Sequence, residues 1–263
     1  IFAGAGTYTN LLFLGENSTN EPEYIGLGSI FKERGSKGLE DVLLNTSIEF
    51  TKIKITEDGS RWTLATGKHG DILLKAQASF PPLSNFSPHI FQGLKTSADK
   101  VYLVKVISDD GELVSVENGL NEKAVVERNI LKQVVKGEDV RRYFTDKSQN
   151  LFIIYPYTVD KDGKAKIISS THLEKNFPRT WAYLNQYKKL LGSRDNGIWL
   201  SRNDWYVYAR SQNIGAFAGA KFLLPYMTTR LRANLDKEEN LFFVNITTGG
   251  YGFRLKVNEK PEY

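Results

Sequence analysis

One segment of this 263-residue chain brings together the side-chain types that bind nucleic acids. Between Trp199 and Asn213, aromatic rings alternate with arginine, asparagine and glutamine. These polar side chains make paired hydrogen bonds to purine edges and to phosphates. We expect half of the rings to lie in the core, so the prediction of nucleic-acid binding rests mainly on the arginines and amides. Arg210 has a second interpretation, because it could instead brace the fold against an acid.

Two other segments imitate catalytic motifs. The glycine-rich run Phe2–Gly6 looks like the turn in which methyltransferases hold S-adenosylmethionine, but a strand-like segment follows where a helix would be needed. The run Asp160–Lys164 has the acid and lysine types of a magnesium-dependent nuclease. Its Asp-Gly step favours the tip of a β-hairpin instead. A methyltransferase or nuclease fragment therefore remains the alternative function.

The remaining composition argues against catalysis by this chain. There is no cysteine for a thiolate nucleophile or a cysteine-bound metal, and the three histidines lie far apart without ligand spacing. The Asn/Asp-Pro-Pro-aromatic signature needed at an adenine amino group is missing; only Pro81-Pro82 occurs. We predict no catalytic, cofactor-binding or metal-ligating residue. The absence of cysteine suits a reducing compartment, so we expect a cytoplasmic protein. No apolar run reaches about 18 residues, so we expect no membrane partner. The start at Ile1 suggests a piece of a longer polypeptide.

The positive charge is unevenly distributed. Residues 1–86 hold 8 Lys/Arg and 10 Asp/Glu, so 27 of the 35 basic residues and 20 of the 30 acidic ones lie in residues 87–263. Residues 175–232 alone contain 10 basic residues and only two acids, Asp195 and Asp204. Such a surplus on one face attracts a polyanion, most commonly nucleic acid. A basic protein-interaction domain that meets an acidic partner is a further alternative.

The pattern of elements predicts an α+β fold that is mainly antiparallel β with a few helices. Residues 1–66 read as mostly β, Asp71–Gln77 as a short helix, and the proline-rich segment 80–88 as a domain boundary. We therefore expect one part over residues 1–86 and a second over residues 87–263. In the second part we expect a hairpin at 101–116 with its turn at 109–111, and a helix over 122–135. We also expect a strand at 151–155 that pairs through the turn at 160–163 with 164–169, and a helix over 178–192.

Several motifs, in this order, resemble the TaqI-like C-terminal specificity domain of type IIG restriction-modification enzymes, which are adenine-specific DNA methyltransferases. The similar segments are IFQGLKTSADKVYLV at Ile90, VERNILKQVVKGEDVRRY at Val126, LFIIYPY at Leu151, FPRTWAYLNQYKKLLGSR at Phe177, WYVYARSQN at Trp205 and GGYGFRL at Gly249. FAGAGTYTNLLFL at Phe2 is similar to the last strands of the catalytic domain. Ser97 and Gln133 depart from the family pattern, where glycine and proline are usual.

The resemblance implies a division of labour. An upstream methyltransferase domain of the same polypeptide would bind S-adenosylmethionine, and the parent protein would also need magnesium if it contains a nuclease. Residues 1–86 would be a remnant of the catalytic domain. Residues 87–263 would recognise the target sequence in duplex DNA. This chain would then be non-catalytic. The residues that we expect to contact DNA are Lys136, Arg141, Arg142, Arg179, Arg202, Arg210, Gln212, Asn213, Arg230 and Arg232.

Overall fold

The computed structural model describes residues 23–24, 51–52, 67–228, 230–237, 241–245 and 247–256. The chain divides into two compact units between Pro82 and Leu83. In the first unit, β1 (Glu23–Tyr24) pairs with the antiparallel β2 (Thr51–Lys52), and α3 (Gly67–Ser79) contains the helix expected at 71–77. The glycine run Phe2–Gly6 and the catalytic-domain motif that begins at Phe2 lie outside the described residues.

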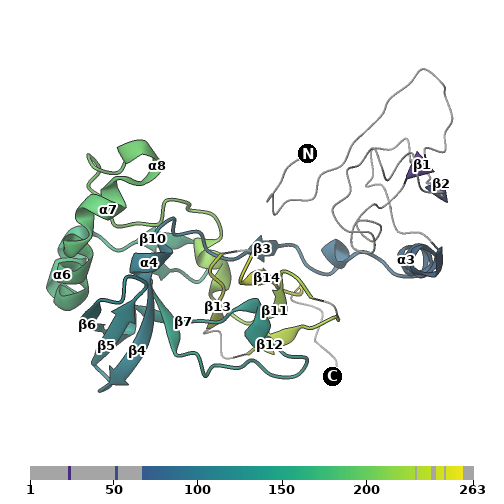
Figure 1. The fold of residues 1–263 in the computed structure, drawn as a ribbon, viewed down its shortest axis with the longest axis horizontal. Helices are drawn as coiled ribbons and strands as arrows, with labels where there is room; N and C mark the ends of the chain where they lie inside the picture. Colours follow the sequence, from purple (N-terminus) through teal and green to yellow (C-terminus); the bar gives the residue numbers. More distant parts are fainter. Residues whose placement is uncertain are drawn as a thin grey trace, which may run out of the picture. The chain divides into compact units, whose positions relative to one another are not determined.

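The second unit is built on a six-stranded sheet (Figure 1). In spatial order its strands are β13 (Leu241–Phe242), β7 (Leu131–Val134), β8 (Leu151–Ile154), β4 (Leu103–Asp109), β5 (Leu113–Asn118) and β6 (Lys123–Glu127). β13 and β7 are parallel, and the other neighbours are antiparallel. Along β5 buried and half-buried residues alternate, as a strand with one face on the core requires.

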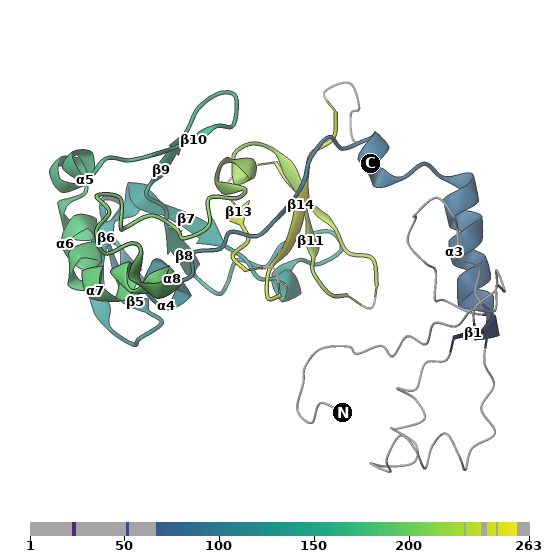
Figure 2. The ribbon, with the colours of Figure 1, turned by 90° about the horizontal axis from the view of Figure 1, so that it is seen from above.

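A second sheet of four antiparallel strands stands beside the first (Figures 1 and 2). Its order is β12 (Asn234–Asp236), β11 (Lys221–Pro225), β14 (Gly250–Phe253) and β3 (Ile90–Gln92). A separate hairpin joins β9 (Tyr157–Val159) to β10 (Ala165–Ile167). The mixture of helices with mainly antiparallel sheets confirms the predicted α+β class.

Most α-helices described in the second unit lie in one stretch of the chain. α4 (Asp99–Tyr102) precedes β4, whereas α5 (Ser170–Asn176), α6 (Pro178–Gln186), α7 (Lys188–Gly192) and α8 (Arg194–Gly197) follow one another after β10. α6 packs against β6, and the Glu127 carboxylate at the end of β6 accepts hydrogen bonds from the backbone N–H groups of Arg179 and Thr180 at 2.8 and 2.9 Å. This caps the helix N-terminus from outside the helix. The helix expected over 178–192 is present as α6 and α7, with a break at Tyr187.

The helix expected over 122–135 is wrong. This segment forms β6, a short 3₁₀ turn at Arg128–Ile130, and β7. The stripe that suggested a helix, Val126, Ile130 and Val134, is buried as expected, but its members belong to the two strands and the turn between them. The β-branched residues of 125–126 favour a strand, and pairing with β5 decides the outcome.

The strand pairings were predicted only in part. β4 and β5 form the expected hairpin, and Gly111 in its turn has a φ of 97°, which glycine adopts without strain. β8, however, pairs with β4 and β7, and the partner of β10 across the turn at 160–163 is the separate strand β9. No helix in the described part of the chain is both long and apolar enough to cross a membrane.

The segment Asp160–Lys164 is the hairpin tip that the sequence favoured over a metal site. The Asp160 carboxylate accepts hydrogen bonds from the backbone N–H groups of Asp162 and Lys164 at 3.1 and 2.9 Å. Gly163 has a φ of 77°, as the turn requires. Within the residues that the structure describes, there is no group of three or more histidine, aspartate or glutamate side chains placed to hold a metal ion.

Candidate nucleic-acid interface

Three segments of the second unit enclose a hollow of about 470 Å³. They are residues 136–141, which follow β7; residues 225–227 with Arg232, at the end of β11 and in the connection to β12; and residues 247–249, which precede β14. Lys136, Arg141 and Arg232 line it, each from the set predicted to contact DNA. We call this the basic hollow.

Backbone hydrogen bonds hold the three segments together. The N–H of Gly137 donates to the carbonyl of Thr248 at 2.7 Å, and the N–H of Tyr226 donates to the carbonyl of Gly249 at 3.3 Å. A Cβ atom on Gly137 would lie 2.4 Å from the Gly249 carbonyl oxygen and 3.2 Å from the Pro225 side chain. The glycine therefore permits a close approach on which the shape of the basic hollow depends.

Gly137→Ala is expected to lower the free energy of unfolding by about 1–3 kcal/mol, because the added methyl group meets backbone rather than a flexible side chain. Chemical denaturation of the 263-residue chain measures this change. Glu138→Ala, at the exposed neighbouring position, is the control and should change stability by less than about 0.5 kcal/mol. Equal stability of Gly137→Ala and the parent chain would contradict the close packing.

The cations of the basic hollow are largely available to a ligand. Lys136 Nζ lies 3.7 Å from the Glu138 carboxylate, a loose and exposed pair, and Arg232 Nε donates to the Thr228 hydroxyl at 3.1 Å. Within the described residues, Arg141 forms no ion pair; Arg142, next to it, lies over the Tyr143 ring at 5.5 Å. The nearby Asp139 carboxylate accepts the Lys136 backbone N–H at 2.7 Å, and among the described residues it makes no ion pair with either arginine. These side chains therefore retain most of their hydrogen-bonding capacity for phosphates.

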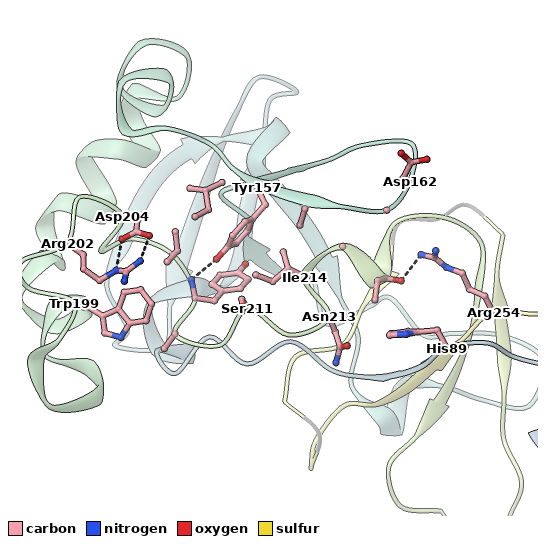
Figure 3. A pocket seen from close by; sticks show the side chains of 18 residues that line it. His89, Tyr157, Asp162, Trp199, Arg202, Asp204, Ser211, Asn213, Ile214 and Arg254 are labelled. Atoms are coloured by element: carbon pink, nitrogen blue, oxygen red, sulfur yellow. Dashed lines mark hydrogen bonds and ion pairs between the residues drawn. The ribbon is translucent and has the colours of Figure 1, made fainter. Parts of the chain in front are cut away.

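A second hollow, of about 680 Å³, lies between the β9–β10 hairpin and residues 199–216 (Figure 3). Two of the predicted residues line it. Arg202 makes two hydrogen bonds of 2.7 Å to the Asp204 carboxylate, and the Asn213 side chain donates to the Gln92 carbonyl at 3.3 Å. Because Asp162 and Asp204 also line this hollow, it is less suited to a polyanion than the basic hollow.

Arg210 braces the fold against an acid, the second of the two interpretations given above. Its guanidinium makes two hydrogen bonds to the Asp195 carboxylate, at 2.9 and 3.0 Å. Asp195 has a φ of 48°, and the Trp199 ring N–H donates to the same carboxylate at 3.0 Å. The bonds from Arg210, and then that from Trp199, lower the pKa of Asp195 below its ordinary value.

Arg210→Gln is expected to raise the pKa of Asp195 towards its ordinary value, because the largest cause of the shift is removed. A carboxyl carbon NMR titration measures this pKa. Because folding lowers the pKa of Asp195, the Arg210–Asp195 pair stabilises the protein at pH values above the ordinary carboxyl pKa. This contribution to stability is lost as the pH falls through the lower pKa of the folded state. Lys189→Ala, an exposed change outside the pair, is the control; an Asp195 pKa that is the same in Arg210→Gln and the parent chain would contradict the assignment.

The other predicted residues lie outside both hollows. Arg179 is exposed in the first turn of α6, Gln212 is exposed next to Asn213, and Arg230 is exposed in the β11–β12 connection. Only the last of these is close in sequence to the basic hollow.

Two features of the sequence were over-interpreted. All four rings in 199–213, at Trp199, Trp205, Tyr206 and Tyr208, are buried, whereas half had been expected in the core. The surplus charge of 175–232 is also smaller at the surface than the count suggests. Arg194 and Lys221 are buried, and the two acids of the segment are the partners of Arg202 and Arg210.

Arg194 and Lys221 serve the fold. Lys221 Nζ lies 2.6 Å from the Asp236 carboxylate in the neighbouring strand β12. Arg194 is 8% exposed and donates to the backbone carbonyls of Leu191, Thr96, Val207 and Trp205.

No protein-family model matches the chain. The geometry of the site is therefore the support for any function beyond the sequence resemblance.

Sequence reasoning missed the uncharged residues of the basic hollow. Thr247 and Thr248 contribute polar groups, and Tyr226 and Met227 contribute exposed apolar surface. The one signal in the sequence was the run Met227–Arg232, in which isolated apolar residues stand among threonines and arginines without the period of a helix or strand.

Proposed function

We propose that residues 87–263 recognise a sequence in duplex DNA and act as the specificity module of a type IIG, adenine-specific DNA methyltransferase. The resemblance of the ordered motifs supports the family, and it assigns S-adenosylmethionine and the catalytic step to an upstream domain. The chain itself would supply contacts to phosphates and base edges. Those contacts help to offset the cost of extruding the target base from the duplex.

The basic hollow is the observation that carries this proposal. Three of the ten predicted cations and amides come from separate segments and meet around one concave surface with hydroxyl groups and a single exposed acid, Glu138. Most protein–DNA hydrogen bonds go to phosphate and sugar, from arginine, lysine, threonine and backbone N–H groups. The same side chains could meet an acidic protein, which is the main alternative.

The experiment that tests the proposal is equilibrium binding of the 263-residue chain to a labelled duplex over a range of salt concentrations. A DNA-binding module is expected to bind with a logarithmic salt slope of about one unit per phosphate contact. When the labelled duplex contains the target sequence, unlabelled duplexes of unrelated sequence should compete for the chain less well than unlabelled copies of that duplex. Equal competition by all duplexes and by heparin would favour a non-specific polyanion or protein-binding surface and contradict the proposal.

A further inference from the structure

Two aliphatic side chains project from the connection between β11 and β12. Leu231 is 84% exposed, the highest value for a large hydrophobic side chain in the described part of the chain, and Met227 is 71% exposed. Burial of such a side chain would remove a large apolar area from water. Met227 lines the basic hollow, and Leu231 precedes Arg232, which also lines it, so we looked for a function for this exposed apolar surface.

The connection that carries them is organised by its own hydrogen bonds. The Thr228 hydroxyl donates to the Arg230 carbonyl at 2.5 Å and accepts from the Arg230 backbone N–H at 3.3 Å and from Arg232 Nε at 3.1 Å. At its end, the Asn234 side chain donates to the Thr145 hydroxyl at 2.6 Å, which ties β12 to the segment after Arg142. Met227 and Leu231 therefore stand next to residues that these hydrogen bonds join, Thr228, Arg230 and Arg232.

Cations neighbour both side chains. Arg230 and Arg232 flank Leu231 in the sequence, and Lys136 and Arg141 line the hollow together with Met227. Met227 and Leu231, which we call the apolar tip, have cations beside them in the sequence or in the hollow, and such a surface is complementary to one that is anionic at its rims and apolar between them. A DNA groove has this character, with phosphates at its edges and base edges at its floor.

Cations at phosphates fix position but carry no sequence information, so the discrimination must come from other side chains. An aliphatic side chain cannot form hydrogen bonds with a base. In the major groove, the base-edge group that it recognises is the methyl group of thymine. Gln212 and Asn213, the amides predicted to read bases, lie outside the basic hollow, and Asn213 is held by the Gln92 carbonyl.

We infer that Leu231 and Met227 enter the major groove and select thymine by contact with its methyl group, while Lys136, Arg141 and Arg232 hold the phosphates on either side. This inference rests on the proposed function. It assigns the choice of sequence to two apolar residues that carry no charge and belong to no catalytic motif.

The test compares the 263-residue parent chain with the double variant Met227→Ala/Leu231→Ala on its preferred duplex, obtained by selection from random sequences. The variant is expected to lose about tenfold in preference over an unrelated duplex while its salt slope stays the same. Replacing the critical thymine by uracil, which removes only the methyl group, should weaken the parent chain and leave the variant unaffected. Ile107→Ala, which truncates another exposed aliphatic side chain at 52% exposure in β4, should retain both properties of the parent.

Every other outcome overturns either the proposed function or this inference. If the parent chain prefers no sequence, the proposed function fails. If the parent chain binds its preferred duplex equally well with uracil in place of thymine, or if the double variant keeps the parent's preference or its sensitivity to uracil, only this inference is overturned. The same variants are added to vesicles of phosphatidylcholine and phosphatidylserine. Vesicle binding that depends on Leu231 and Met227, with unchanged DNA preference, would assign the apolar tip to a membrane surface and overturn the inference.

Discussion

Replacing Lys136, Arg141 and Arg232 together by alanine is expected to lower the affinity for duplex DNA roughly 100-fold at physiological salt. Each phosphate contact releases about 0.9 of a counterion, which is worth roughly fivefold in affinity at about 0.15 M salt. Because the three residues line one hollow from three segments, we expect them to contact neighbouring phosphates of the same duplex. The logarithmic salt slope should fall by about three units in the same variant.

The matched control removes the same charge from other places. Lys161 and Lys164 are exposed at the tip of the β9–β10 hairpin, and Lys189 is exposed on α7. The variant Lys161→Ala/Lys164→Ala/Lys189→Ala has the same net charge as the first triple variant, so a non-specific attraction would weaken equally in both. We expect it to keep the parent's salt slope. Equal losses in the two variants would show that net charge, and not the basic hollow, governs binding.

Arg194→Leu is expected to lower the free energy of unfolding by about 3–5 kcal/mol. The buried guanidinium donates to four backbone carbonyls, at distances of 2.6 to 3.1 Å, and these would lose their partner in a buried site. It also lies 5.2 Å from the Trp199 ring and 6.0 Å from the Tyr102 ring. Arg194→Lys should be nearly as harmful, because one ammonium group cannot reproduce the planar fork.

Chemical denaturation measures the loss, with Lys175→Ala as the control. Lys175 is exposed at the end of α5, and its truncation should cost less than about 0.5 kcal/mol. A loss below about 1 kcal/mol in Arg194→Leu would mean that the four carbonyls find other donors, and the structural role of this arginine would be wrong.

Local sequence signals predicted the elements that depend on local chemistry. The hairpin at Asp109–Gly111 follows from the left-handed conformation that glycine allows, and the start of α6 from the fixed φ of Pro178. The segment 122–135 was misread because a stripe of apolar residues four apart fits a helix, yet it also fits two short strands joined by a turn. Pairing with β5, which a periodicity count does not contain, decides between them.

The sequence indicated the residue types of the candidate site, but not which of these residues meet in space. The partners that bury Arg194 include the Thr96 carbonyl, 98 residues earlier in the chain, so its position in the sequence gave no sign that it is unavailable to DNA. The basic hollow depends on Gly137 meeting residues 248 and 249, again a long-range contact. Arg210 had two interpretations in the sequence analysis, and the structure supplies the acid of one of them, Asp195.

Selection from a pool of random duplexes tests the central claim most directly. The 263-residue chain is mixed with the pool, bound duplexes are recovered and amplified over several rounds, and the enriched sequences are read. The account predicts convergence on one short sequence, which is lost when Lys136, Arg141 and Arg232 are replaced by alanine. Recovery of duplexes with no common sequence, at a salt concentration where the chain still binds DNA, would contradict it.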